Sequence, residues 1–242
     1  RAKKLCMTIH DELSSSQLSN KALFILIKHV DIIFVTGHSI ADQLKKTTNK
    51  EIIIQPSGVS DIFFKEREKI IDQRSFKIII TSNLVKKKNL GMVLDIAKDL
   101  PLLSFLVVGE GPEKKYLEGR IKYEKIDNIQ MLGFKTASEL HLLYCEADIF
   151  LMTSIKEGTP TAMLEAMACG LPIVTSGAGR VKNILQSDSY IVENNEKESY
   201  VKCITELLKN NTQMRKISKN NRLLADSFSW KNVARNIEIH IV

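Results

Sequence analysis

Two glutamates, Glu157 and Glu165, stand eight residues apart and are the residues of this 242-residue chain best placed to do chemistry. They bracket Gly-Thr-Pro-Thr-Ala-Met-Leu, an otherwise apolar stretch. Two carboxylates at this spacing can transfer protons or accept hydrogen bonds from ligand hydroxyls. An ionised carboxylate among apolar residues also needs a hydrogen-bonding partner, because burying it alone is costly. We therefore expect this segment to bind a ligand.

The segment predicts a short buried helix. Thr159 suits its N-cap, Pro160 suits the first helical position, and Gly170 followed by Pro172 should end it. The residues between are apolar nearly all round, and Glu165 is their one charge. Backbone N–H groups at a helix start form a ready anion site. Here these are the N–H groups of Thr161, Ala162 and Met163.

Candidate strands and helices alternate along the chain. The strands are expected at 5–9, 31–36, 52–55, 77–81, 104–108, 128–132, 148–152 and 172–175. The helices are expected at 17–29, 40–46, 90–99, 112–123, 137–146, 160–169, 196–209, 212–226 and 230–241. Apolar strands that alternate with helices predict an α/β protein with a parallel, doubly wound sheet.

In such a sheet, ligands bind where the strands end. The strand expected at 77–81 is followed by Lys86, Lys87 and Lys88, which either clamp a diphosphate or form an exposed charge run. Gly109-Glu-Gly-Pro112 follows the next strand and resembles the start of a dinucleotide fingerprint, but a tight turn into a helix is the favoured interpretation. Gly133-Phe134 is a further small turn.

His10 follows the first expected strand. A lone histidine at this place is as well explained by a structural hydrogen bond as by catalysis. No histidine–carboxylate cluster in the sequence has metal-ligand spacing, so no metal is expected.

Composition narrows the class of protein. The chain is 44% apolar and 26% charged, and its four cysteines are scattered, which fits reduced thiols in the cytoplasm. The net charge of +7 favours anionic partners or a solvated lysine-rich surface, and no motif supports nucleic-acid binding. The apolar stretch Ala22–Val30 forms a core helix or, with the basic charge, touches the inner face of an anionic membrane.

These motifs together resemble a known family. The pattern E-x7-E followed by A-M-A-x-G-x-P resembles the retaining nucleotide-sugar glycosyltransferases of family four, which have the GT-B fold. The resemblance covers nearly the whole chain. Its other segments are Thr8–Asp11, Pro56–Val59, Lys86–Leu90, Val107–Pro112, Leu132–Phe134, Ala147–Ser154 and Phe228–Trp230.

The resemblance implies a role for each matching residue. Glu157 would bind hydroxyls of the donor sugar and, with His10 from the other lobe, serve the catalytic centre. Glu165 would bind the ribose hydroxyls, and Lys88 would neutralise the diphosphate. The remaining implied donor-binding residues are Gly109, Gly133 and Phe134 around the base, and Gly158, Thr159, Thr161, Ala162 and Met163 around the helix start.

The resemblance also implies a domain plan. Residues 1–60 would end an N-terminal, acceptor-side domain, residues 61–226 would form a complete donor-binding Rossmann-like domain, and residues 227–242 would form a helix that crosses back. The family's glycine-rich loop and acceptor-binding strands, which come before this point, are expected to be missing. The implied partners are a nucleoside-diphosphate sugar and a glycan or lipid-linked acceptor, and the implied process is bacterial surface polysaccharide synthesis.

Three departures from the family keep other functions open. Asn83 replaces an arginine and Asn183 a glutamate of the family pattern, which suits a degenerate GT-B lobe that only binds or scaffolds. Arg180 replaces a glycine and could supply the missing cation. A nucleotide-sugar epimerase of the same fold is the third interpretation. The enzyme is favoured because Glu157, Glu165 and Lys88 are all present.

Overall fold

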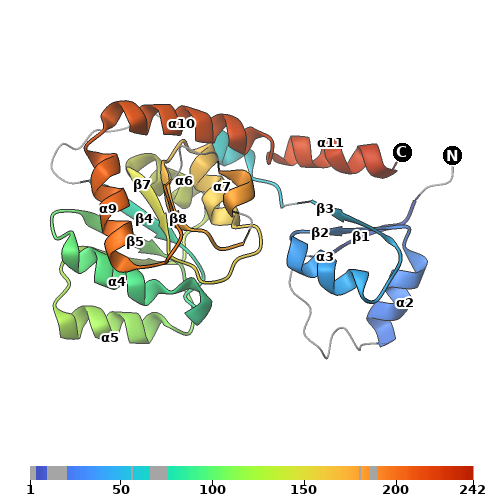
Figure 1. Cartoon of the computed structure of the whole chain (residues 1–242), viewed down its shortest axis with the longest axis horizontal. Coiled ribbons are helices and arrows are strands. Elements are labelled where there is room, and N and C mark those ends of the chain that lie inside the picture. The colour runs from blue at the N-terminus through green and yellow to red at the C-terminus, as the bar shows by residue number, and fades with distance from the viewer. Residues whose placement is uncertain are drawn as a thin grey trace. The chain divides into compact units, whose positions relative to one another are not determined.

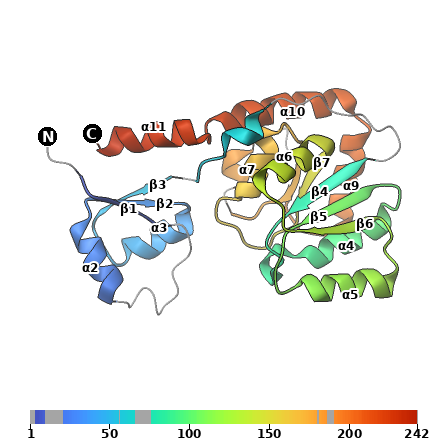
Figure 2. The same ribbon diagram turned by 180° about the vertical axis from the view of Figure 1, so that it is seen from behind.

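The computed structural model describes residues 4–9, 21–55, 57–65, 76–179, 181–185 and 190–241. The chain divides into two compact units (Figures 1 and 2). Unit 1 comprises Arg1–Gly58 together with Ser227–Val242, and unit 2 comprises Val59–Asp226. The roles assigned to the domains from the sequence stay predictions.

Unit 1 contains a three-stranded parallel sheet in the order β1-β2-β3. Its strands are β1 (Cys6–Ile9), β2 (Ile32–Val35) and β3 (Glu51–Ile54), and its helices are α2 (Lys21–His29), α3 (His38–Lys45) and α11 (Trp230–Ile241). Side chains alternate across the central strand. Ile33 and Val35 pack with residues of α2 and α3 in one core cluster, whereas the Phe34 ring meets the His240 ring of α11.

Unit 2 contains a six-stranded parallel sheet in the order β6-β5-β4-β7-β8-β9. The strands are β4 (Lys77–Thr81), β5 (Ser104–Val108), β6 (Ile129–Gly133), β7 (Ile149–Met152), β8 (Ile173–Ser176) and β9 (Tyr190–Val192). The chain builds outward from β4 in one direction and then returns to add β7 on its other side. The strand order therefore reverses between β4 and β7, which is the switch point where ligands bind in open α/β sheets.

Helices cover both faces of this sheet (Figures 1 and 2). On one face lie α4 (Leu90–Asp99), α5 (Lys114–Glu124) and α9 (Lys197–Leu208), whose apolar residues share a core cluster with the sheet. On the other lie α6 (Ala137–Glu146), α7 (Thr161–Ala168) and α10 (Asn211–Asp226). Because both faces are buried, Ile78, Ile79 and Ile80 of β4 are all at most 2% exposed. The doubly wound parallel sheet predicted from the sequence is confirmed.

Several short elements of the structure were not predicted from the sequence. They are strand β9, helix α8 (Val181–Ile184) and the 3₁₀ turns η1 (Asp61–Phe64) and η2 (Lys86–Lys88). Elements of three or four residues are too short to show a hydrophobic period. The helix expected from Gln17 is described from Lys21 onward, and residues 17–20 lie outside the described residues.

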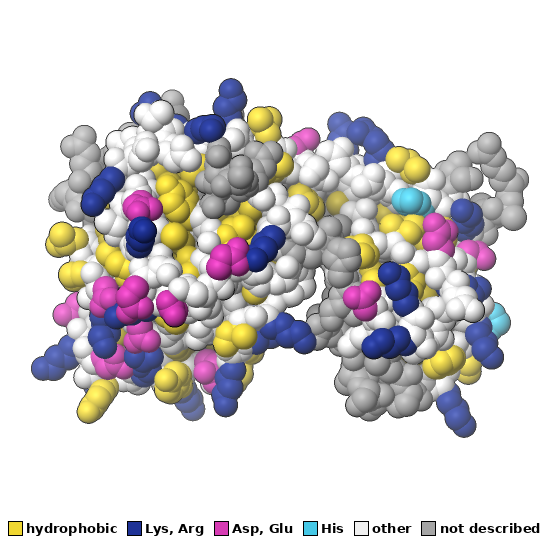
Figure 3. All heavy atoms as spheres, in the orientation of Figure 1, with side chains coloured by type: hydrophobic (Ala, Val, Ile, Leu, Met, Phe, Trp, Pro, Cys, Tyr) yellow, Lys and Arg dark blue, Asp and Glu magenta, His cyan; other side chains and the backbone are white. Residues whose placement is uncertain are grey.

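Positive charge does not gather on the visible face. Lysine and arginine side chains are spread over both units there, with aspartate and glutamate among them (Figure 3). In the described part of the chain, no helix is long and apolar enough to span a membrane.

Candidate functional site

The loops after the central strands of unit 2 meet at the carboxyl edge of its sheet. Backbone hydrogen bonds join the loop after β4 to the loop after β5, from Leu84 N–H to Glu110 O at 2.9 Å. The loop after β5 is joined to the end of β6, from Gly109 N–H to Gly133 O at 2.9 Å. The loop after β7 is joined to η2, from the amide of Ile155 to the carbonyl of Lys87 at 2.8 Å. The candidate residues of four separate segments therefore lie on one connected surface.

Lys88 and Glu157 form an ion pair across the switch point. Lys88 Nζ lies 2.5 Å from Glu157 Oε1, and the two side chains are only 19% and 7% exposed. Ser154 Oγ donates a second hydrogen bond to the same carboxylate oxygen, at 2.6 Å. A charge this buried needs such compensation. From the sequence, the two residues were expected to bind different parts of a donor, whereas in the structure they bind each other.

The turn that carries Lys88 is fixed at both ends. Lys88 N–H donates to Val85 O at 2.9 Å, and Asn89 closes the turn in the left-handed region with φ 51°. The Thr153 hydroxyl, at the end of β7, donates to the carbonyls of Lys88 and Asn89 at 3.2 and 3.1 Å. The side chain of Thr153 thus fixes the backbone of the turn that carries Lys88.

Helix α7 begins one residue later than predicted. Pro160, not Thr159, is its N-cap, with an extended backbone that makes no side-chain cap bond. The Met163 N–H donates to Pro160 O at 3.0 Å, so this amide is already engaged. In the described part of the chain, the N–H groups of Thr161 and Ala162 have no acceptor. Two amides and the positive end of the helix dipole therefore remain for an anion.

Glu165 has a protein neighbour that the sequence did not reveal. Burial raises the pKa of its carboxyl from 4.5 to about 7, and a hydrogen bond with Tyr144 acts in the opposite direction. The Tyr144 hydroxyl also donates to Ala162 O at 3.2 Å. Burial and the nearby Glu165 raise the pKa of this phenol well above its ordinary value, so it stays protonated. Tyr144 thus ties α6 to the first turn of α7 and lies beside Glu165.

Two glycines allow neighbouring loops at the carboxyl edge of the sheet to lie close together. Gly109 has φ +135°, and a Cβ there would lie 1.9 Å from Ser82 O. Gly179, after β8, has φ +68°, and a Cβ there would lie 2.5 Å from the backbone oxygen of Glu157. Only glycine fits either position. The sequence did not reveal that Gly179 packs against the loop that carries Glu157.

The other predicted site residues are placed as follows. Phe134 is 74% exposed beside Gly133, and open space surrounds Gly158. His10 and Arg180 lie outside the described residues, as does Pro56 of the predicted inter-domain turn. Among the described residues, no group of three or more histidines, cysteines or carboxylates could hold a metal ion.

Comparison with known proteins shows which protein family this chain matches. The family model of glycosyl transferases group 1 matches residues 61–224. The chain is 28% identical over 236 residues to a phosphatidylinositol N-acetylglucosaminyltransferase subunit of Homo sapiens, covering 93% of this chain and 48% of that protein. It is 26% identical over 176 residues to the putative colanic acid biosynthesis glycosyltransferase WcaL of Escherichia coli K12, covering 67% and 43%. The chain spans about half the length of these curated relatives.

Solved structures agree in fold. The pneumococcal O-GlcNAc transferase GtfA, solved with UDP and GlcNAc, superposes with a TM-score of 0.74 at 20% identity, over 98% of this chain and 52% of that chain. Alr3699/HepE of Anabaena, solved with UDP and glucose, gives 0.79 at 16% identity, over 98% and 71%. These likenesses confirm the predicted GT-B type of α/β fold, with Rossmann-like parallel sheets.

Proposed function

We propose, since this chain belongs to the glycosyl transferases group 1 family, that it forms the donor-binding part of a retaining glycosyltransferase of family four. Its donor would be a nucleoside-diphosphate sugar, its acceptor a glycan or a lipid-linked acceptor, and its process bacterial surface polysaccharide synthesis. The observation that carries the proposal is the Lys88–Glu157 ion pair beside two unengaged helix-start amides. One small surface thus offers a cation and N–H donors for phosphate, and a carboxylate for sugar hydroxyls.

Each group would have a distinct task with a donor. The amides of Thr161 and Ala162 would hold the distal phosphate, and Lys88 would turn from Glu157 to the diphosphate. The released Glu157 carboxylate would accept hydrogen bonds from the transferred sugar. Breaking the sugar–phosphate bond leaves negative charge on the nucleoside diphosphate. A lysine and a helix start stabilise that charge without requiring a metal.

Glu165 would accept hydrogen bonds from the ribose. Burial disfavours the ionised form of its carboxyl, and hydrogen bonds donated by ribose hydroxyls would stabilise that form. The turns at Gly109 and Gly133 would place backbone and Phe134 beside the base. The catalytic role that the family resemblance implies for His10 stays a prediction.

The names of the relatives guide the acceptor. They include a putative colanic acid glycosyltransferase, the alpha-monoglucosyldiacylglycerol synthase of Acholeplasma laidlawii and the human phosphatidylinositol N-acetylglucosaminyltransferase subunit. A lipid-linked acceptor suits α2, where Ile25 and Leu26 are 57% and 56% exposed between Lys21 and Lys28. We propose that the protein works in the cytoplasm at the inner membrane face, with this helix touching anionic lipid.

Calorimetry with uridine diphosphate tests the donor site most directly. This nucleotide is the first probe because GtfA and HepE were solved with it. We expect saturable binding, with guanosine and adenosine diphosphates as comparison ligands. Heat changes indistinguishable from dilution for all three nucleotides and for their sugar conjugates would remove the proposal.

A further inference from the structure

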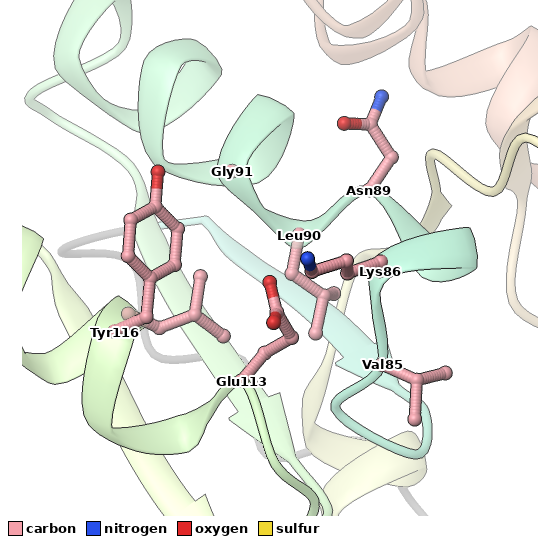
Figure 4. Close-up of a pocket in the computed structure, with 8 residues that line it drawn as sticks. Val85, Lys86, Asn89, Leu90, Gly91, Glu113 and Tyr116 are labelled. Atoms are coloured by element: carbon pink, nitrogen blue, oxygen red, sulfur yellow. The ribbon is translucent and has the colours of Figure 1, made fainter.

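A pocket of about 520 Å³ lies beside the candidate donor site on unit 2 (Figure 4). It opens between the η2 turn and the start of α5. The buried side chains of Leu90 and Leu117 line its apolar part, and Lys86, Glu113 and Tyr116 supply its polar groups. Its volume falls within the range of small-molecule sites, about 300–1,000 Å³.

The polar groups of the pocket are available to a ligand. Lys86 and Glu113 point toward one another across it, and Tyr116 rises from α5 beside α4 (Figure 4). In the described part of the chain, none of these three side chains has a hydrogen bond or an ion pair. The Tyr116 side chain is 55% exposed, so its ring offers a face to solvent.

Their charges select the class of ligand. One ammonium and one carboxylate lie together, so their charges sum to zero and the pair favours neither an anion nor a cation. A neutral molecule that both donates and accepts hydrogen bonds satisfies all three side chains. The exposed tyrosine ring adds an apolar surface, and an aromatic ring with a polar tip suits a ligand with both kinds of surface. Neutral sugars combine apolar C–H faces with hydroxyl groups.

The pocket is adjacent to the donor site and distinct from it. A 3₁₀ turn has three residues per turn, so Lys86 and Lys88 point in different directions from η2. Lys88 points to Glu157, whereas Lys86 points into the pocket. The backbone of the loop after β4 connects the two sites. Glu113 N–H, at the pocket, donates to Leu84 O of this loop at 2.9 Å, and Lys88 N–H donates to Val85 O at 2.9 Å.

We propose that this pocket is a subsite for a neutral saccharide, built on the same loop that carries Lys88. The choice of a saccharide among neutral polar ligands rests on the proposed function. The position of the pocket does not, because it follows from the η2 turn, the start of α4 and α5.

Saturation-transfer NMR on the 242-residue chain tests the subsite without nucleotide. The probes are glucose, galactose, mannose, N-acetylglucosamine, maltose and chitobiose. We expect at least one of them to bind, and Tyr116→Ala to weaken that binding at least fivefold. Tyr123→Ala is the matched control, because Tyr123 lies on the same helix, is 89% exposed and does not line the pocket. Glu113→Gln is a second test variant, expected to weaken binding at least threefold.

The outcomes separate this proposal from the donor site. Binding of none of the six sugars overturns it, as does equal binding by the Tyr116→Ala and Tyr123→Ala variants. Displacement of the bound sugar by uridine diphosphate would assign the sugar to the donor site and also overturn it. Calorimetry with uridine diphosphate on the same sample reports on the donor site alone, so either proposal can fail while the other stands.

Discussion

Lys88 Nζ and Glu157 Oε1 lie 2.5 Å apart, although the two residues are separated by 69 positions in the sequence. They come from the loops after β4 and β7, the strands between which the order of the sheet reverses. Each charge is compensated by the other while both are nearly shielded from water. On the proposed function, a donor that engages both residues would have to separate this pair.

Lys88→Met should weaken binding of uridine diphosphate by tenfold or more. Charge-assisted hydrogen bonds contribute about 1.5–3 kcal/mol, and here one would be lost to phosphate. Calorimetry at fixed ionic strength measures the change. Lys87→Met is the control, because Lys87 is exposed and belongs to the same turn. Equal losses in the two variants would point to general electrostatic attraction instead of a contact from Lys88.

Glu157→Gln should destabilise the fold and remove discrimination for the sugar. Removing one member of a buried ion pair leaves the other charge uncompensated, which lowers the free energy of unfolding by about 3 kcal/mol. The Ser154 hydroxyl also loses its ionised acceptor. Urea unfolding measures the stability. In calorimetry, the variant should bind uridine diphosphate and its glucose conjugate with equal affinity. Glu193→Gln, in an exposed pair with Lys182, should change neither property. A preserved preference for the conjugate would contradict the assigned role of Glu157.

Glu165 should make stability depend on pH. Its pKa is about 7 in the folded chain against 4.5 ordinarily, so the folded state binds more protons than the unfolded state between these values. The stabilisation is fully present below pH 4.5 and is lost as the pH rises through 7, amounting to about 3 kcal/mol. Urea unfolding across this pH range, continued to about one unit above the folded pKa, measures it.

The variant Glu165→Gln should lose this decline, whereas Glu118→Gln, at an exposed position of α5, should keep it. If Glu165 binds the donor ribose as proposed, the ribose hydroxyls stabilise its ionised form, and nucleotide affinity should rise with pH through about 7 in the wild type. A flat stability profile in the wild type would show that the carboxyl is not perturbed.

Gly179→Ala should destabilise unit 2 and weaken donor binding. The residue has φ +68°, and the added Cβ would lie 2.5 Å from Glu157 O, so the loop carrying Glu157 must shift. We expect a loss of about 2 kcal/mol in urea unfolding. Gly119→Ala, on α5 with open space around it, should instead stabilise the chain by about 0.5–1 kcal/mol. Unchanged stability in Gly179→Ala would show that the loop adapts freely.

The regular elements were predictable because each has a local cause. The buried strands β4 and β5 and the helices α4 and α6 begin and end at the predicted residues. Thr136 and Glu139 form a capping box that fixes the start of α6. Element β9 and the η2 turn were missed, because three residues show no period and their conformation depends on neighbouring segments.

The residues of the candidate site could be predicted from the sequence, but the contacts between them could not. The motif around Glu157 and Glu165 identified the helix start and the carboxylates, and the lysine run after the first strand of unit 2 identified Lys88. Tyr144 gave no signal, because a tyrosine within an amphipathic helix is indistinguishable from a core residue until α6 packs beside α7. The N-cap of α7 is Pro160 instead of the predicted Thr159, because the backbone of Pro160 is extended and the helix begins at Thr161.

The sequence by itself determined the alternation of strands and helices, the parallel sheet and the set of chemistry-bearing residues, since these follow from local periodicity and residue type. Tertiary structure alone decided that Lys88 pairs with Glu157, that Tyr144 lies beside Glu165 and that Lys86, Glu113 and Tyr116 share a pocket. The physical reason is that these relationships join residues from different loops. The strand order and backbone hydrogen bonds of the folded sheet set the distances between them.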